Sequence, residues 1–468
     1  MAQVRIEQGA CSMTVKAFMP ERNLNLVVPL AHEATAMRTT ETAATVQDRP
    51  GAVALLIGAS LRPGDVDRTT SRSTRTATRG SRTSTTATRT TTTRAPSCVP
   101  APSADPDLFE QLVLAYLDCR RTKRNSASAL AFEAHAERNL FDLHEQLVDG
   151  SYSPGRSICF VVTRPRPREV WAADFRDRIV HHLLYNKVAP RFYARFTADT
   201  CACIPGRGTL YAAQRLEHQV RSITQNWNRP AHYLKCDLAN FFVAIDKATL
   251  RAQLARHITE PWWMLLAETV LMHDPRTDVE IRGRHDLLKL VPPHKRLMEA
   301  PDGKGLPIGN LSSQFFANVY LNDLDQRVKH VLRAKRFVRY VDDFVLLHED
   351  PAWLNAALHD IEAWLPAQLG ARLNPTKTIL QPIDRGIDFV GHVIKPWRRT
   401  TRRRTVAHAV DRIRHAPASE LFETVNSYFG LLRQASHSHA DRAQLANAIR
   451  ARGHCVNRSM TKAFRTAS

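Results

Sequence analysis

The stretch RFVRYVDDFVLLHED, residues 336–350, places two adjacent aspartates between two runs of apolar and aromatic residues. This pattern predicts a half-buried β-hairpin. Alternation along the chain assigns its residues to two faces: Val338, Tyr340, Asp342, Phe344 and Leu346 to one, and Val341, Asp343, Val345 and Leu347 to the other. Two neighbouring carboxylates in such a hairpin repel each other and lose hydration. The hairpin therefore needs a compensating positive charge.

A divalent metal ion is one group that supplies this charge. Mg²⁺ prefers oxygen ligands and keeps water or substrate phosphates in its shell. A third acid, Asp237, ends the apolar strand within KCDLANFF, residues 235–242. If that strand lies antiparallel beside the hairpin, Asp237, Asp342 and Asp343 are able to hold two ions ~4 Å apart for in-line phosphoryl transfer. Taken singly, each signal also fits a structural role, the aspartate pair as a turn and Asp237 as a cap.

Seven segments lie within residues 157–396. They are RPRPREVWAADFRDRIVHH (164–182), CACIPGRGTLYA (201–212), KCDLANFF (235–242), GLPIGNLSSQFFAN (305–318), YVDD (340–343), LNPTKTIL (373–380) and GIDFVGHVI (386–394). In this order, they resemble the motifs of reverse transcriptases. Each motif alone is common, but their order is specific. The resemblance implies an RNA-directed DNA polymerase.

The fold implied by this resemblance is an α+β right-hand polymerase. It has fingers, a palm that combines an antiparallel sheet with helices, and a short helical thumb, and a disordered N-terminal tail precedes it. The expected boundaries are 1–104 for the tail, 105–230 for N-terminal helices and fingers, 231–396 for the palm with a finger insertion at about 251–304, and 397–468 for a basic helical thumb.

The tail assignment rests on composition, because residues 69–94 are almost only Thr, Arg, Ser and Ala and cannot bury a core. An over-extended start of the reading frame is a second interpretation, and a nucleic-acid-binding arm is a third.

The resemblance also implies the chemistry of the site. Asp237, Asp342 and Asp343 would bind two Mg²⁺ ions, with Mn²⁺ as the alternative, and Leu238 would lend its backbone carbonyl. The metals would lower the pKa of the primer 3′-hydroxyl. Lys377 stands where the family has a candidate general acid for the leaving pyrophosphate; as a lone lysine, it is otherwise a surface residue.

Further residues are implied to contact the incoming dNTP or the template. Arg166 and Arg168 suit the triphosphate, because guanidinium groups bind phosphate through two hydrogen bonds; a solvated loop is the alternative. Phe242 matches an aromatic ring that would clash with a ribose 2′-OH, or else it is a core residue. Arg207, between Gly206 and Gly208, lies where the backbone would approach the template closely.

The segment IGNLSSQ, residues 308–314, departs from the Q-G-x-x-x-S-P form of group II intron and retron relatives. Ile308, Gly309 and Gln314 instead resemble the enzymes of diversity-generating retroelements. A glutamine at 308 would hydrogen-bond near the forming base pair, whereas isoleucine cannot, and the loss of a polar contact loosens selection. Ile308 as a packing residue at the start of a helix is the other interpretation.

That subtype implies an enzyme that copies a template-repeat RNA with errors opposite adenines, together with a small basic helical accessory protein. Two alternatives remain open. One is a group II intron-like or phage-defence reverse transcriptase, and the other is a non-catalytic RNA-binding scaffold.

Charge and cysteine usage fit an RNA template, an RNA–DNA hybrid and dNTPs as partners. The chain has 66 Lys and Arg against 45 Asp and Glu. Residues 395–468 alone hold 15 Lys and Arg against 4 Asp and Glu. A basic end favours a polyanion; a basic protein without such a partner is the alternative.

Eight scattered cysteines without a C-x-x-C pair favour a reduced, cytoplasmic protein without zinc. No membrane contact is expected, because the longest uncharged apolar run, residues 51–61, is too short to span a bilayer.

Overall fold

The computed structural model describes residues 103–123, 125–163 and 166–464, which divide into two compact units. The first unit ends at Ser153 and contains α2 (Leu108–Lys123), α3 (Ala127–Glu133) and α4 (Ala136–Val148). Apolar spacing in the sequence predicts a helix that begins near Leu108 and a second, single helix over 128–150. The structure confirms the first as α2 but divides the second into α3 and α4. The chain breaks that helix at His135, where φ is −136° and no side chain caps the next turn. The tail expected over 1–104 lies, except for its last two residues, outside the described residues.

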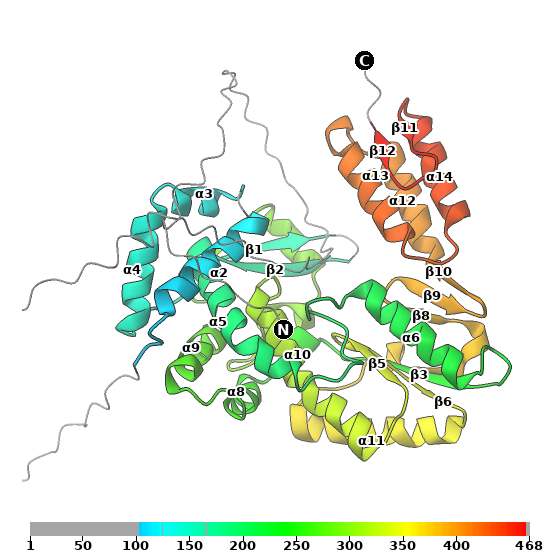
Figure 1. The fold of residues 1–468 in the computed structure, drawn as a ribbon, viewed down its shortest axis with the longest axis horizontal. Helices are drawn as coiled ribbons and strands as arrows, with labels where there is room; N and C mark the ends of the chain where they lie inside the picture. Colours follow the sequence, from blue (N-terminus) through cyan, green and yellow to red (C-terminus); the bar gives the residue numbers. More distant parts are fainter. Residues whose placement is uncertain (1–102, 124, 164–165, 465–468) are drawn as a thin grey trace, which may run out of the picture. The chain divides into compact units, whose positions relative to one another are not determined.

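The palm of the second unit is a four-stranded antiparallel sheet. Its strands are β5 (Phe337–Tyr340), β6 (Asp343–His348), β3 (His232–Asp237) and β7 (Ile379–Pro382), in that order. In Figure 1, α6 (Thr209–Ile223) lies along one face and α11 (Pro351–Leu369) along the other. Side chains of α6 share one apolar cluster with Tyr233, Val345 and Leu347 of the sheet. Because helices cover both faces, the strands are buried on both sides, not on one as the sequence pattern indicated.

The expected division of the hairpin into two faces is wrong at one point. Residues 341–342 form a two-residue turn, so Val338 pairs with Val345 and Tyr340 pairs with Asp343. Paired residues of an antiparallel ladder share a face. Val338 therefore joins Val345 in the cluster under α6, whereas simple alternation through the turn had put them on opposite faces.

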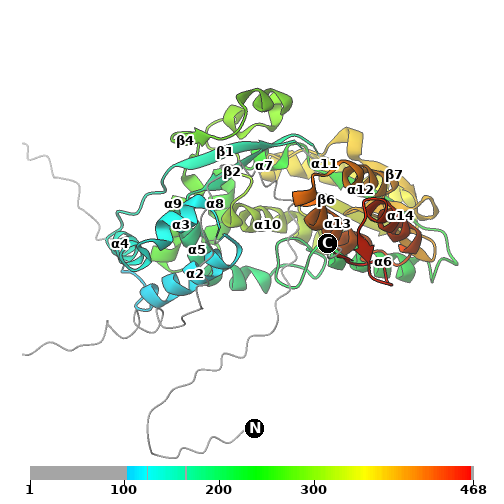
Figure 2. The ribbon, with the colours of Figure 1, turned by 90° about the horizontal axis from the view of Figure 1, so that it is seen from above.

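A second sheet has the order β2-β1-β4, and its strands are β2 (Arg168–Ala173), β1 (Ser157–Val162) and β4 (Val279–Ile281). Figure 2 shows the three strands side by side. The sequence pattern over 157–171 predicts a strand, a loop and a strand, and the pairing of β1 with β2 confirms it. Within the expected insertion, β4 pairs in parallel with β1, which the sequence did not reveal.

Helices complete this part of the unit. They are α5 (Phe175–Tyr193), α7 (Phe241–Ala244), α8 (Lys247–Ala255), α9 (Pro261–Met272) and α10 (Leu311–Gln326). Shorter helical turns are η1 (His285–Leu290), η2 (Pro293–Lys295), η3 (Leu297–Glu299), η4 (Arg327–Val331), η5 (Pro375–Lys377) and η6 (Ile383–Arg385). Helices α5 and α10 pack through Phe192 and Phe315, whose ring centroids are 5.3 Å apart. The sequence over 303–332 predicts a Gly-rich loop that leads into a long helix, and α10 with its continuation η4 confirms the helix.

The C-terminal part begins with a third sheet, β8 (Ile387–Phe389), β9 (His392–Lys395) and β10 (Arg398–Thr401). Helices α12 (Arg403–His415), α13 (Ala418–Leu432) and α14 (His439–Arg450) follow with a core of their own, and β11 (Cys455–Val456) pairs with β12 (Ala463–Phe464). Within the basic helical thumb expected over 397–468, the first element is the strand β10, which extends the preceding hairpin, and helices follow from Arg403. Within the described ranges, no helix is both long and apolar enough to cross a membrane.

Candidate active site

The palm sheet brings three aspartates together at one end. Strand β3 lies beside β6 with Asp237 opposite Asp343, so these two side chains share a face. Asp342 lies in the turn before β6, and its carbonyl accepts a hydrogen bond from the backbone N–H of Leu238 at 3.2 Å. Asp237 and Asp343, 106 positions apart in the chain, thus lie side by side at the ends of adjacent antiparallel strands, and Asp342 precedes Asp343 in the turn.

The turn that carries Asp342 is conformationally strained. Val341 has φ of 56°, in the left-handed region that a β-branched residue rarely adopts. The surrounding structure must hold such a residue in place, and such positions cluster at functional sites. The Val341 carbonyl accepts a hydrogen bond from Nη1 of Arg339 at 3.0 Å.

The electrostatics of the site favour a bound cation. Burial first, and then the charges of Asp237 and Asp343, raise the pKa of Asp342 to about 7. Burial also raises the pKa of Asp343. The Lys377 ammonium lies 2.6 Å from Oδ1 of Asp237. The charges of Lys235 and Lys377 both lower the pKa of Asp343, but burial and the Asp237 carboxylate outweigh them.

The donor set fits a divalent metal ion, although the side chains do not form a closed cage. Among the described residues, no group of three or more His, Cys, Asp or Glu side chains is arranged to hold an ion. One oxygen of Asp237 is taken by Lys377. Three carboxylates at one strand end nevertheless provide the hard oxygen donors and the negative charge that Mg²⁺ or Mn²⁺ requires.

The Gly-rich loop docks against the second sheet through two hydrogen bonds. The Trp171 N–H donates to the Ile308 carbonyl at 2.7 Å, and the Ala173 N–H donates to Oδ1 of Asn310 at 3.1 Å. Gly309, between these bonds, has φ of 134°. The loop is thus fixed by the Ile308 backbone and the Asn310 side chain, and the Ile308 side chain stays half-buried.

Other expected contact residues have partners inside the protein. Gln314 accepts a weak hydrogen bond from the Cys203 thiol at 3.5 Å. Nη1 of Arg207 donates to the carbonyls of Thr197 and Thr200 at 2.8 and 2.7 Å, so this guanidinium ties a loop together.

The remaining expected residues divide into two groups. Phe242 is half-buried on α7, 5.3 Å from the ring of Phe241. Arg166 and Arg168 are exposed at the tip of the β1–β2 hairpin, next to residues 164–165, which are not described. Within the described part of the chain, these two arginines are not in contact with the three aspartates.

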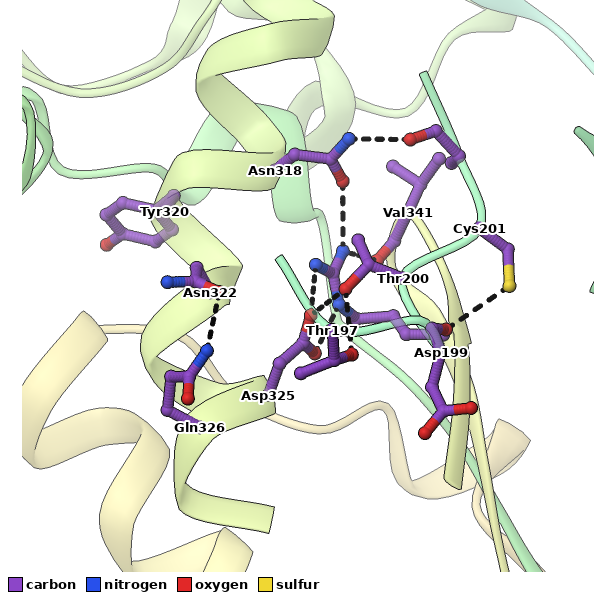
Figure 3. Close-up of polar contacts among 12 residues, drawn as sticks. Thr197, Asp199, Thr200, Cys201, Asn318, Tyr320, Asn322, Asp325, Gln326 and Val341 are labelled. Atoms are coloured by element: carbon purple, nitrogen blue, oxygen red, sulfur yellow. Dashed lines mark hydrogen bonds and ion pairs between the residues drawn. The ribbon is translucent and has the colours of Figure 1, made fainter. Parts of the chain in front are cut away.

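A buried polar group beside the turn was not expected from the sequence (Figure 3). Arg339 and Asp325 are both 0% exposed and form an ion pair. Asn374 was also missed; its N–H donates to the Asp237 carbonyl at 2.7 Å. A signal for Arg339 was present, because an arginine inside the apolar strand FVRY must be paired if it is buried.

Residues 165–394 match the family model described as "Reverse transcriptase (RNA-dependent DNA polymerase)". Apo telomerase from Candida tropicalis, truncated from its C-terminal domain, is similar at 13% identity and a TM-score of 0.38 over 52% of this chain and 54% of that one. Telomerase from Candida albicans, in complex with a TWJ fragment of telomeric RNA, is similar at 12% identity and a TM-score of 0.39 over 63% and 55%. This chain therefore spans about half the length of both proteins. No curated protein matches it significantly.

Proposed function

We propose that this chain, whose residues 165–394 are a reverse transcriptase domain, copies an RNA template into DNA by metal-assisted phosphoryl transfer. The observation that carries the proposal is the meeting of Asp237, Asp342 and Asp343 at the ends of two adjacent strands. Primer extension on poly(rA)/oligo(dT) with Mg²⁺ and dTTP tests it. RNA binding without any incorporation would instead support a non-catalytic scaffold.

Each aspartate has a defined task in this proposal. Asp237 and Asp343, on one face, and Asp342, in the turn, would hold the metal ions, with the backbone carbonyl of Leu238 as a further oxygen donor. When bound, Mg²⁺ or Mn²⁺ lowers the pKa of the primer 3′-hydroxyl and neutralises the triphosphate. Lys377, already beside Asp237, would donate a proton to the leaving pyrophosphate.

The dNTP and template would contact the residues that surround this centre. Arg166 and Arg168 are exposed and would bind the triphosphate once it is present. Gly309 and Gln314 belong to the loop and helix that would lie beside the templating base. Arg207 would act mainly by fixing the loop at 197–200 next to the template path.

Phe242 is expected to exclude ribonucleotides. Its replacement by valine should reduce the preference for dNTPs over rNTPs by at least about 10-fold, because removing the ring opens space for a 2′-OH. The ratio of kcat/KM for dTTP and UTP measures this. Phe241→Leu is the matched control, since Phe241 is buried on the same helix and should leave the ratio unchanged. An unchanged ratio for Phe242→Val would make Phe242 a packing residue.

The more specific proposal is the error-prone enzyme of a diversity-generating retroelement, with a small basic helical protein as its partner. The segment IGNLSSQ supports this subtype, as does the position of Ile308, half-buried in a loop whose backbone is anchored to β2. An apolar side chain there offers the forming base pair no hydrogen bond. A wrong base pair is therefore rejected less strongly than it would be beside a polar side chain.

Sequencing cDNA copied from an RNA of mixed bases tests the subtype. Wild type should misincorporate opposite adenines at least about 10-fold more often than opposite other bases, and Ile308→Gln should reduce that excess. Ile308→Val, which stays apolar, should keep it. Equal error rates at all four template bases would favour the group II intron-like or phage-defence alternative.

A further inference from the structure

The buried ion pair of Arg339 and Asp325 joins the palm sheet to α10. Nε and Nη2 of Arg339 each lie 2.7 Å from a different oxygen of Asp325, which is a two-bond fork (Figure 3). Both side chains are 0% exposed. Asp325 also accepts a hydrogen bond from the Thr200 hydroxyl at 2.6 Å. The charge of the guanidinium is thus fully paired inside the protein.

The third nitrogen of Arg339 reaches the strained turn. Nη1 donates to the Val341 carbonyl at 3.0 Å and to Oδ1 of Asn318 at 3.3 Å. The Asn318 amide donates to the Ala202 carbonyl at 2.6 Å. The guanidinium therefore connects α10 with the turn before β6, and its partners Asp325 and Asn318 extend the network to the loop at 200–202.

Stability alone does not account for this arrangement. A buried ion pair rarely stabilises a fold more than apolar residues of similar size would. A guanidinium fork does fix direction, because its donors are rigid and planar. Here the donors fix the carbonyl of Val341, the residue with φ of 56° that precedes Asp342.

We propose that Arg339 is a positioning residue that fixes the turn carrying Asp342 and Asp343 relative to α10. This inference rests on the proposed function, because the turn matters through the metal ions that its carboxylates would bind. Asn318 supports it by orienting the fork. Groups that orient metal ligands change metal affinity or activity by about 10–100-fold when they are removed.

Arg339→Lys is the test variant, because lysine keeps the charge but cannot contact Asp325, Asn318 and Val341 in one plane. We expect kcat for primer extension to fall by about 10–100-fold, while KM for dTTP changes less than about 3-fold. The dissociation constant for Mn²⁺, measured by isothermal titration calorimetry on the full chain without nucleic acid, should rise by about 10-fold.

Arg327→Lys is the matched control. Arg327 forms the same fork with Asp360, with both contacts at 2.8 Å, and does not contact the turn. It should leave kcat and Mn²⁺ affinity within about 2-fold of wild type. The folded fraction of each variant is compared by circular dichroism at the assay temperature.

If the Arg339→Lys variant folds and its kcat and Mn²⁺ affinity are unchanged, the positioning role of Arg339 is wrong, and the polymerase assignment still stands. If wild type makes no DNA, the proposed function fails, and the Mn²⁺ comparison still decides whether Arg339 positions the turn. If Arg339→Lys does not fold, Asn318→Ala decides, since it keeps the ion pair. Its kcat and Mn²⁺ affinity should fall by about 3–10-fold, and no change in either would overturn the inference.

Discussion

Replacing Asp342 by asparagine is expected to reduce dTTP incorporation on poly(rA)/oligo(dT) by at least about 10³-fold. Asparagine keeps the shape of the side chain but removes the charge that would hold a metal ion. The loss should appear in kcat, because the ions would stabilise charge that develops in the transition state. Initial rates of primer extension at saturating dTTP and several Mg²⁺ concentrations measure it.

The same substitution should stabilise the fold when no divalent ion is present. The pKa of Asp342 is raised from its ordinary value of 3.8 to about 7, so the charged form is disfavoured in the folded state. Wild type therefore loses stability as pH rises from about 4 to about 7, by up to about 4 kcal/mol, and Asp342→Asn avoids this loss. Urea unfolding in EDTA should show a larger gain for the variant at pH 8 than at pH 5, and Mg²⁺ should stabilise wild type more than the variant.

Asp384→Asn is the control for both measurements, because Asp384 is exposed in η6 and away from the three carboxylates. It should change neither rate nor stability. If Asp342→Asn retained normal incorporation, the assignment of the site would be wrong. A variant that is inactive and also less stable than wild type in EDTA at pH 8 would show that burial and the neighbouring carboxylates do not destabilise the charged form of Asp342.

The sequence predicts those elements of the fold that depend only on residues close together in the chain. The strand before Asp237, the hairpin around Asp342 and the helix that begins at Thr209 all follow from apolar periodicity and turn residues, and the structure confirms them. The contact between Asp237 and Asp343 needed more than periodicity. It was predicted because carboxylates at strand ends are costly unless they share a cation.

Long-range partners and side-chain directions could not be predicted. Arg339 pairs with Asp325, which lies on another element, and nothing in the sequence near either residue indicates the other. Arg207 was expected at the template, yet its guanidinium donates to the carbonyls of Thr197 and Thr200, a contact that the local sequence does not indicate. The register shift at the two-residue turn likewise depends on the φ of Val341, which pattern alone does not give.

Replacing Gly309 by alanine is expected to impair both folding and synthesis. A Cβ there would lie 2.4 Å from the Trp171 carbonyl oxygen and 3.1 Å from a methyl of Val170, and φ is 134°. The loop must leave β2, and it then loses the bond from Trp171 to Ile308. We expect a loss of about 2–4 kcal/mol in the free energy of unfolding and at least about 10-fold in kcat/KM.

Gly430→Ala is a matched control, because Gly430 lies inside α13 with nothing within 4 Å of its added Cβ. That change should be neutral or stabilise the protein by about 0.5–1 kcal/mol.

For Gly309→Ala, the loss in the free energy of unfolding and the loss in kcat/KM have different causes. The loop is partly exposed there and is able to swing away from β2, which limits the stability loss to the docking contacts. The value of kcat/KM should fall further if Ile308 must lie beside the forming base pair, because a displaced loop no longer holds it there. If a Gly309→Ala variant is measurably destabilised but keeps its kcat/KM, the docking of this loop contributes to stability and not to the selection of the nucleotide.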